Sequence, residues 1–410
     1  MGSIVEHKSI FSDLEQIPYD EAYRVQQAFN QDPSPDKISL GAGVYRDENA
    51  QPWTLPSVKL AMTRIPDIHD YLLQSGFPPF LAAARELLFG ELARDLSPRL
   101  ASVQTIAGTG ACHVGTELLV KKLRPKTVWI ADPTWINHSL MWTVGAPEVA
   151  QKFYPYYDAK TKAFNFQGTM AALEGAEKGD VVILQACAHN PTGLDPSKEE
   201  WKAIAELCEK RGLILFFDCA YQGFASGDPD ADAWAVRYFA SRPNMELCIA
   251  QSFSKNMGLY GERIGAFHLL VADPAVVPAA SAQLVRVIRS EVSCSVSFAA
   301  RTVAAVLDDD ELRKQWREDL KTMSNRMKSM REALRDELEK MGTPGRWEHI
   351  TDQIGMFSYT GLSANQVEII AKKHHIYMLS SGRIAIPGLN QSNISIVAAA
   401  IDDVVRHVKD

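Results

Sequence analysis

Four short hydrophobic runs between about residues 100 and 270 dominate the pattern of the chain. Each comprises four or five residues without polar alternation, at residues 128–131, 181–185, 213–217 and 247–250. Runs of this kind are typical of strands that are covered on both faces. Helical patterns separate them, and strands that alternate with helices predict right-handed crossovers and a mainly parallel sheet.

Two helices have clear sequence signals at their ends. One is predicted from residue 197 to residue 211, because Ser197 occupies the N-cap position and Glu200 follows at the capping-box position. The other is predicted over residues 308–341, where hydrophobic residues recur at spacings of three and four until Gly342. A helix of this length predicts a connector between two domains.

The pattern therefore predicts an α/β protein with a large and a smaller domain. We expect an N-terminal arm and part of the small domain in residues 1–50, and the large domain in residues 51–310. The connector helix and the rest of the small domain are expected in residues 311–410. The last of these ranges contains a strand candidate at 356–359, a loop ending at Arg383 and a closing helix.

Composition and charge narrow the classes of function. The chain has 410 residues, 46% of them hydrophobic and 23% charged, as in ordinary globular proteins. A net charge of −7 without a basic stripe argues against a nucleic-acid partner. No window of 18 uninterrupted apolar residues is present, which predicts no membrane span. A metal site is not predicted either.

The cysteines and the chain ends predict a cytoplasmic protein. The six cysteines are scattered without a C-x-x-C pair, which predicts reduced thiols. Residues 1–6 show no hydrophobic or arginine-rich leader, and Glu6 stands where a myristoylation signal requires Ser or Thr. The C-terminal Val-Lys-Asp is not a peroxisomal address.

A lysine just past the last hydrophobic run carries the candidate chemistry. Lys255 lies in Gln-Ser-Phe-Ser-Lys-Asn, flanked by Ser252 and Ser254, and Arg263 follows eight residues later. A lysine amine forms an imine with an aldehyde, and hydroxyls with a guanidinium suit a phosphate dianion. These groups predict pyridoxal 5'-phosphate held as a covalent imine on Lys255. Taken alone, Lys255 is as easily a solvated surface lysine, so the prediction depends on the rest of the chain.

Three further residues fit the ring of such a cofactor. Asp218 ends the run at 213–217, where its carboxylate is placed to pair with a pyridinium N–H; the alternative is a turn-capping Asp. Tyr221 and Asn190 are each placed to bond the ring oxygen. The alternatives are a core tyrosine and ordinary Asn-Pro turn chemistry.

The helix start after Ala107 fits a phosphate, and Trp135 fits a ring. Gly108 and Thr109 offer backbone N–H groups and a hydroxyl at this start. The glycine spacing does not match a dinucleotide fingerprint. Trp135 follows the run at 128–131, where an indole is placed to stack on a pyridine ring, although a core role is the alternative.

Two arginines are candidates for binding carboxylates. Arg383 lies among glycine and small residues, where its planar fork suits bidentate capture of a carboxylate. Arg289 is placed to hold a second carboxylate. Glu291 follows two residues later and is a possible partner of a nearby cation; the sequence leaves this open.

Together these motifs resemble the aspartate aminotransferases, the fold-type I pyridoxal-phosphate enzymes, in their eukaryotic subgroup. The resemblance extends from Ser39 to Arg406 and rests on the motifs at 186–193, 217–224, 251–263 and 381–383, in the family order and spacing. It implies a large domain with a mainly parallel seven-stranded sheet and a smaller α/β domain formed by both termini. It also implies a homodimer with two shared active sites.

The resemblance implies roles for individual residues. Lys255 moves the proton of the reaction, and Tyr71, Trp135, Asp218 and Tyr221 are the other catalytic residues. The cofactor contacts are Gly108, Thr109, Trp135, His138, Asn190, Asp218, Tyr221, Ser252, Ser254, Lys255, Arg263 and, from the partner, Tyr71. The substrate contacts are Gly43, Trp135, Asn190, Arg383 for the α-carboxylate and, from the partner, Arg289 for a distal carboxylate.

Four departures from the family pattern bear on the substrate. The region before Tyr71 is a few residues short, and three segments differ in sequence. The segment Cys294-Ser295-Val296 stands where Asn-Pro-Pro is usual. Glu21-Ala22-Tyr23 occupies the N-terminal gating segment, whose last two positions are usually aliphatic. Gln185 stands where a histidine behind the ring aspartate is common.

The resemblance implies a transaminase that converts L-aspartate and 2-oxoglutarate to oxaloacetate and L-glutamate. The implied mechanism is ping-pong and passes through an aldimine, a quinonoid and a ketimine. One alternative keeps the cofactor and the fold but acts on a specialised amino acid by elimination, replacement or decarboxylation. A second alternative is a non-catalytic homologue. The expected partners are amino acids, 2-oxo acids and a second copy of the chain.

Overall fold

The structure is a computed structural model that describes residues 9–408. The sequence-based predictions for residues 1–6 and for residues 409 and 410 lie outside the described residues. Within the described range, no helix combines the length and the apolar character needed to cross a membrane.

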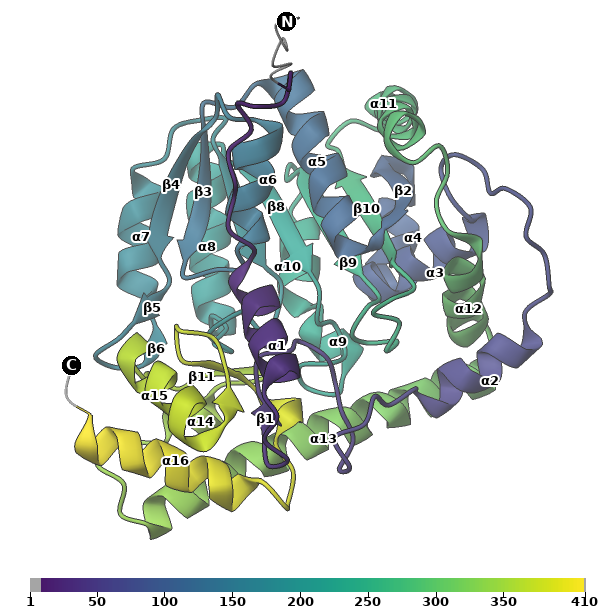
Figure 1. The fold of residues 1–410 in the computed structure, drawn as a ribbon. Coiled ribbons are helices and arrows are strands. Elements are labelled where there is room, and N and C mark those ends of the chain that lie inside the picture. Colours follow the sequence, from purple (N-terminus) through teal and green to yellow (C-terminus); the bar gives the residue numbers. More distant parts are fainter. Residues whose placement is uncertain (1–8, 409–410) are drawn as a thin grey trace, which may run out of the picture.

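A seven-stranded sheet forms the centre of the large domain (Figure 1), as predicted. Its strand order is β2-β10-β9-β8-β7-β3-β4. The pairs from β9 to β4 are parallel, whereas β10 runs antiparallel to both of its neighbours. The four predicted runs are β3 (Thr127–Asp132), β7 (Val181–Gln185), β8 (Ile214–Cys219) and β9 (Leu247–Ser252). The sequence did not predict β2 (Leu100–Ile106), β4 (Ala150–Pro155) or β10 (Ile264–Leu270).

Helices cover both faces of this sheet because successive strand residues point to opposite sides. Phe216 of β8 packs with one core, whereas its neighbours Leu215 and Phe217 pack with the other. The first core includes residues of α5 (Ala107–Leu123), α6 (Asn137–Gly145) and α11 (Val277–Glu291). The second includes residues of α3 (Pro78–Phe89), α7 (Phe166–Glu174), α8 (Lys198–Arg211) and α10 (Trp234–Ala240). The capping box predicted between Ser197 and Glu200 is present in α8.

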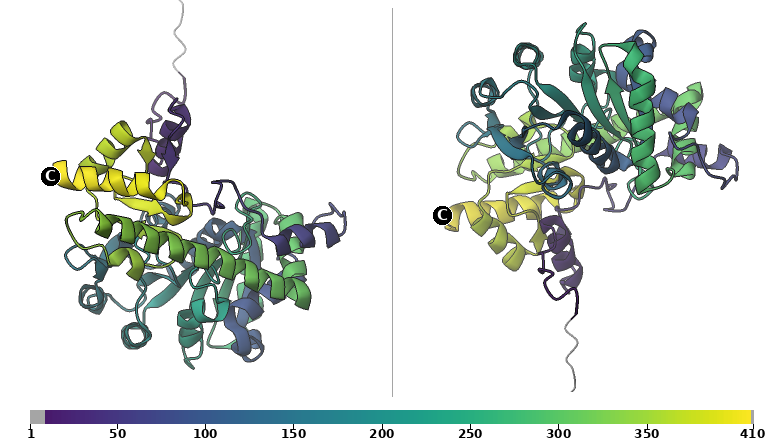
Figure 2. Two further views of the ribbon diagram at one scale, coloured as in Figure 1. Left: turned by 90° about the horizontal axis from the view of Figure 1, so that it is seen from below. Right: turned by 90° about the horizontal axis from the view of Figure 1, so that it is seen from above.

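The predicted connector helix is α13 (Asp310–Lys340). Figure 2 shows α16 (Ile394–His407) lying along it, and both helices contribute to one hydrophobic core. The rest of the C-terminal region contains α14 (His349–Asp352), β11 (Phe357–Tyr359), α15 (Ala364–His374), β12 (Ile376–Tyr377) and β13 (Arg383–Ala385). The N-terminal β1 (Ile38–Ser39) pairs in parallel with β12. This pairing supports a small domain built from both termini, and we retain the boundaries at residues 50 and 310 as a proposal.

The remaining elements connect these layers. They are the helices α1 (Glu21–Gln31), α2 (Pro56–Arg64), α4 (Ala93–Leu96), α9 (Pro229–Asp232) and α12 (Ser297–Asp308), and the strands β5 (Tyr157–Asp158) and β6 (Ala163–Phe164). Short 3-10 turns lie at Gly90–Leu92, Ser97–Arg99, Pro274–Val276 and Ile386–Gly388.

Three site residues lie inside strands rather than in the loops where the sequence suggested them. Asp218 belongs to β8 and Ser252 to β9, because their neighbours continue the hydrogen-bonded ladder past the hydrophobic runs. Arg383 begins β13, since it pairs with Tyr359 of β11. Strand backbones hold these side chains in fixed directions, which loops would not.

Candidate active site

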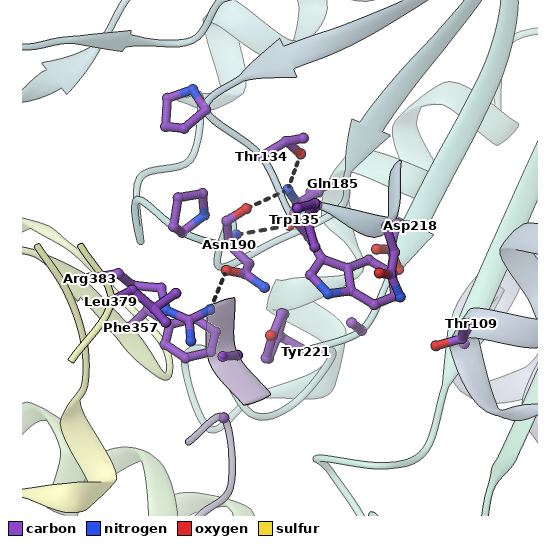
Figure 3. Close-up of a pocket in the computed structure, with 18 of the residues that line it drawn as sticks. Thr109, Thr134, Trp135, Gln185, Asn190, Asp218, Tyr221, Phe357, Leu379 and Arg383 are labelled. Atoms are coloured by element: carbon purple, nitrogen blue, oxygen red, sulfur yellow. Dashed lines mark hydrogen bonds between the residues drawn. The ribbon is translucent and has the colours of Figure 1, made fainter. Parts of the chain in front are cut away.

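A cavity of about 850 Å³ lies at the carboxyl ends of the parallel strands. Figure 3 shows side chains from the sheet and from the C-terminal region facing each other across it. Most of the predicted site residues line this cavity: Gly43, Gly108, Thr109, Trp135, Asn190, Asp218, Tyr221, Ser252, Ser254, Lys255, Arg263 and Arg383. A site at this position follows from the parallel sheet, whose strand ends and helix starts meet at one edge.

A chain of buried hydrogen bonds fixes the Asp218 carboxylate. His138, in the first turn of α6, lies with Nε2 2.9 Å from Asp218 Oδ2. The other ring nitrogen of His138 lies 2.8 Å from Thr134 Oγ1. Asp218 and His138 are both almost fully buried. A carboxylate held in this way suits a protonated ring nitrogen, since opposite charges attract strongly in a poorly solvated site.

Lys255 follows β9 and is half-buried against the aromatic ring of Tyr221. Its Nζ lies 5.2 Å from the Tyr221 ring centroid. Burial lowers the pKa of Lys255, the nearby Asp218 opposes this shift, and Arg263 adds to it. The amine therefore loses its proton more readily than a solvated lysine does, as a nucleophile requires.

The amino end of α5 forms a cradle for an anion. No side chain within residues 9–408 caps this helix end, and Gly108 and Thr109 of its first turn line the cavity. A Cβ atom at Gly108 would lie 2.8 Å from the Cβ of Ser252, so glycine permits the helix to approach β9. The Ala107 N–H donates to the carbonyl of Arg263, which fixes the arginine backbone beside the cradle. The cradle thus combines backbone N–H groups, hydroxyls and a guanidinium.

Arg383 faces the same cavity from β13. Its Nη1 donates to Asn190 Oδ1 at 3.2 Å, and its Nη2 donates to the carbonyl of Gly41 at 2.9 Å. The guanidinium lies 4.0 Å from the centroid of the Phe357 ring. Its Nε is buried and has no hydrogen-bond partner among the described residues. Burial lowers the pKa of Arg383 to about 10, and a buried guanidinium with a donor to spare suits a bound carboxylate.

Gln185 holds the Asn190 loop rather than Asp218. Its side-chain amide donates to the carbonyl of Asn190 at 3.0 Å and to Thr134 Oγ1 at 3.2 Å. Its Oε1 accepts the N–H of Asn190 at 2.8 Å (Figure 3). Gln185 therefore connects the Asn190 loop to Thr134, the residue that lies beside the ring of His138.

Sequence reasoning missed Phe357 and Gly41 as parts of the site, and it noted Gln185 only as a departure from the family pattern behind Asp218. A polar residue at the end of the fully hydrophobic run 181–185 was a usable signal for Gln185. Phe357 and Gly41 carry no such signal, since their roles depend on the position of Arg383.

Tyr71 and Arg289 lie outside the cavity of their own chain. Tyr71 is 89% exposed in the loop between α2 and α3. Arg289 is exposed in the last turn of α11 and donates to Ser293 Oγ. Glu291 Oε1 lies 2.9 Å from His113 Nε2. His138 lies behind Asp218, as predicted.

The residues that line the cavity fit pyridoxal phosphate. An amine, a buried carboxylate, a phenol and an anion cradle surround one space, and the Trp135 indole stands edge-on to His138, with ring centroids 5.4 Å apart. The amine fits the aldehyde of the cofactor, the carboxylate its ring nitrogen and the phenol its ring oxygen. The anion cradle fits its phosphate, and the indole fits the face of its ring.

Comparisons with known proteins agree with this chemistry. A family model described as aminotransferase class I and II matches residues 35–401. An L-tyrosine:2-oxoglutarate aminotransferase from Aspergillus ustus is 45% identical over 96% of this chain and 78% of the relative. The structure of the aspartate aminotransferase from Saccharomyces cerevisiae cytoplasm matches with a TM-score of 0.94 and 41% identity, over 98% of this chain and 99% of that one. An aromatic-amino-acid aminotransferase from Burkholderia pseudomallei, covalently bound to pyridoxal phosphate, matches with a TM-score of 0.92 and 37% identity, over 97% and 100%.

Proposed function

The chain belongs to the class I and II aminotransferases, and we propose that it transfers the amino group of L-aspartate to 2-oxoglutarate with pyridoxal phosphate on Lys255. One observation carries the proposal. The buried guanidinium of Arg383, with its unpartnered Nε, faces the same cavity as the amine of Lys255 and the carboxylate of Asp218. An amino acid requires a clamp for its carboxylate, a group that takes the Cα proton and an electron sink.

When bound, pyridoxal phosphate supplies the electron sink that stabilises negative charge at the substrate Cα. Asp218 supports this role, because its carboxylate favours a proton on the ring nitrogen, and His138 keeps the carboxylate in position. Tyr221 and Asn190 are placed to bond the ring oxygen. Gly108, Thr109, Ser252 and Arg263 are the proposed phosphate contacts, with Ser254 beside them.

Lys255 Nζ is the proposed base that takes the proton from the substrate Cα. Its lowered pKa favours this role, because a neutral amine is present at lower pH than in a free lysine. Arg383 binds the α-carboxylate and so fixes the direction of the Cα–H bond, assisted by the backbone of Gly43. Orientation of this kind accounts for a large share of the rate of such reactions.

A second copy of the chain is the proposed source of Tyr71 and Arg289. Both residues lie outside the cavity of their own chain, on a surface with large exposed hydrophobic side chains. Ile68, Leu73, Val292 and Phe298 are exposed near the two residues in the sequence, and Ile10, Phe11 and Leu14 are exposed elsewhere, on the N-terminal arm. Apolar surface of this extent is typical of protein interfaces. We also propose a cytoplasmic location, as for the yeast relative.

Aromatic donors are the second candidate substrates. The tyrosine aminotransferase from Aspergillus ustus is 45% identical to this chain. The loop at 294–296 departs from the usual Asn-Pro-Pro, and the small side chain of Ala22 lines the cavity where a larger aliphatic one is usual. A smaller side chain at residue 22 leaves more room in the cavity, which favours a bulkier substrate.

The donor profile of the purified enzyme tests these proposals. L-aspartate and L-tyrosine are each assayed with 2-oxoglutarate, and formation of L-glutamate is followed. We expect exchange with both donors and a higher kcat/KM with aspartate. A higher kcat/KM with tyrosine would favour the second candidate. No exchange with either donor, together with a normal cofactor spectrum, would favour elimination, replacement or decarboxylation instead.

A further inference from the structure

A single buried glutamine connects two loops that are distant in the sequence. Gln104 lies on β2 and is fully buried. Its backbone N–H donates to the carbonyl of Ser75 at 2.9 Å, and its side-chain Oε1 accepts the N–H of Phe77 at 3.0 Å. Its side-chain Nε2 donates to the carbonyl of Val296 at 2.7 Å, and its backbone carbonyl accepts the hydroxyl of Ser295 at 3.0 Å. All four of its polar groups therefore bond to loops.

One of these loops carries Tyr71, and the other follows the last turn of α11, which carries Arg289. The loop between α2 and α3 includes Tyr71 and leads into Ser75 and Phe77. The segment between α11 and α12 begins at Val292, shortly after Arg289, and contains Ser293, whose hydroxyl accepts a hydrogen bond from Arg289. Both loops lie on the side of the large domain where β2 forms the edge of the sheet (Figure 1).

The first loop packs closely against Gln104. Gly76 has a φ of +109°, and a Cβ atom at this position would lie 2.2 Å from the Cβ of Gln104. The strand that holds Gln104 continues directly into α5, whose first turn forms the anion cradle. The glutamine thus links both loops to the strand that leads into the proposed phosphate site.

We propose that Gln104 is a positioning residue that fixes the positions of Tyr71 and Arg289, so that both reach the active site of a second copy. This inference rests on the proposed function and on the proposed dimer. Removal of the amide would take from the N–H of Phe77 and the carbonyl of Val296 their partners in part-buried positions, which favours movement of both loops. A displaced guanidinium would lose the geometry that a distal carboxylate requires.

The variant Gln104→Met tests the inference, because methionine has a similar size and cannot form these hydrogen bonds. We expect the KM for L-aspartate to rise by about tenfold, the size of effect that loss of a buried hydrogen bond produces, while kcat changes little. The kcat/KM for L-phenylalanine, which has no distal carboxylate, should change much less. The apoenzyme should also bind pyridoxal phosphate more weakly, as measured by fluorescence titration.

Two further variants separate positioning from a loss of stability. His268 is buried on the neighbouring β10 and bonds to Ser102 and Gln251 within the sheet, with no bond to either loop. We expect His268→Leu to lower the melting temperature without changing the donor ratio. Ser295→Ala removes one bond, from the second loop to Gln104, so it should lower the preference for aspartate while cofactor affinity stays unchanged.

The outcomes that would overturn the inference are specific. The inference fails if Gln104→Met lowers kcat/KM for both donors equally or leaves cofactor affinity unchanged. It also fails if this variant lowers only the melting temperature, as we expect of His268→Leu. If Gln104→Met fails to fold, an unchanged donor ratio in Ser295→Ala overturns it. If the wild-type enzyme does not exchange aspartate at all, the proposed function fails, whereas the cofactor titration still reports on Gln104.

Discussion

The cofactor end and the distal substrate end of the site are built differently. At the cofactor end, Asp218 and Ser252 lie on strands, the amino end of α5 supplies the anion cradle, and Lys255 follows β9 in the same cavity. At the distal end, Arg289 lies on an exposed turn of α11 outside that cavity, and the expected partner contact to the cofactor, Tyr71, is likewise exposed. The difference teaches that the sheet of one chain brings together most groups of the proposed cofactor site, whereas Tyr71 is expected from a second copy. Recognition of the substrate side chain depends on loops and, in our proposal, on a second copy.

The largest expected effect lies at the cofactor end. Lys255→Ala should lower kcat by about 10⁴-fold or more, because it removes both the imine-forming amine and the proposed base. The fold should persist, as checked by circular dichroism. Lys122→Ala, an exposed lysine on α5, is the control and should retain full activity. Substantial turnover in the Lys255 variant would end the assignment.

A mixed dimer probes the distal end. Arg289→Leu should lower kcat/KM for aspartate by about 10²- to 10³-fold, because a carboxylate would be bound without its cation. When Arg289→Leu and Lys255→Ala chains are mixed and reassembled, aspartate activity should return. About a quarter of the sites would then be intact, since random pairing gives one complete site in each mixed dimer. Mixtures that remain inactive would place Arg289 within its own subunit's site, or outside any site.

The smallest expected effects sharpen the electrostatic picture of Lys255. Asp218 raises the pKa of Lys255 and Arg263 lowers it. Asp218→Asn should therefore lower the pKa of Lys255 further, and Arg263→Gln should raise it. The pH dependence of chemical labelling of Lys255 in the apoenzyme measures both shifts. Shifts of the same sign in the two variants would contradict this account.

The sequence predicted the cofactor end well for a physical reason. Uniform hydrophobic runs mark buried parallel strands, and polar residues at their ends fall at the common edge of the sheet. The strands β2, β4 and β10 were missed because polar residues interrupt their sequences. Gln104 and His268 are buried in β2 and β10, where hydrogen bonds to loops and to the sheet satisfy them. Such bonds depend on residues far away in the sequence.

The contacts expected from a second copy were predictable only through resemblance to a family. Arg289 and Tyr71 are surface residues within one chain, and no local pattern indicates what they contact. The same limit applies to Gln185 and Phe357, whose partners come from other elements. Local patterns predict the element on which a residue lies, whereas the residues that it contacts depend on tertiary and quaternary packing.

The central claim is that one amine, Nζ of Lys255, carries the aldehyde cofactor. Borohydride reduction of the enzyme loaded with pyridoxal phosphate, followed by proteolysis and mass spectrometry, tests this directly. We predict a single pyridoxyl-phosphate label on the peptide that contains Lys255. A label on another lysine, or an unlabelled Lys255 after reduction, would contradict the account.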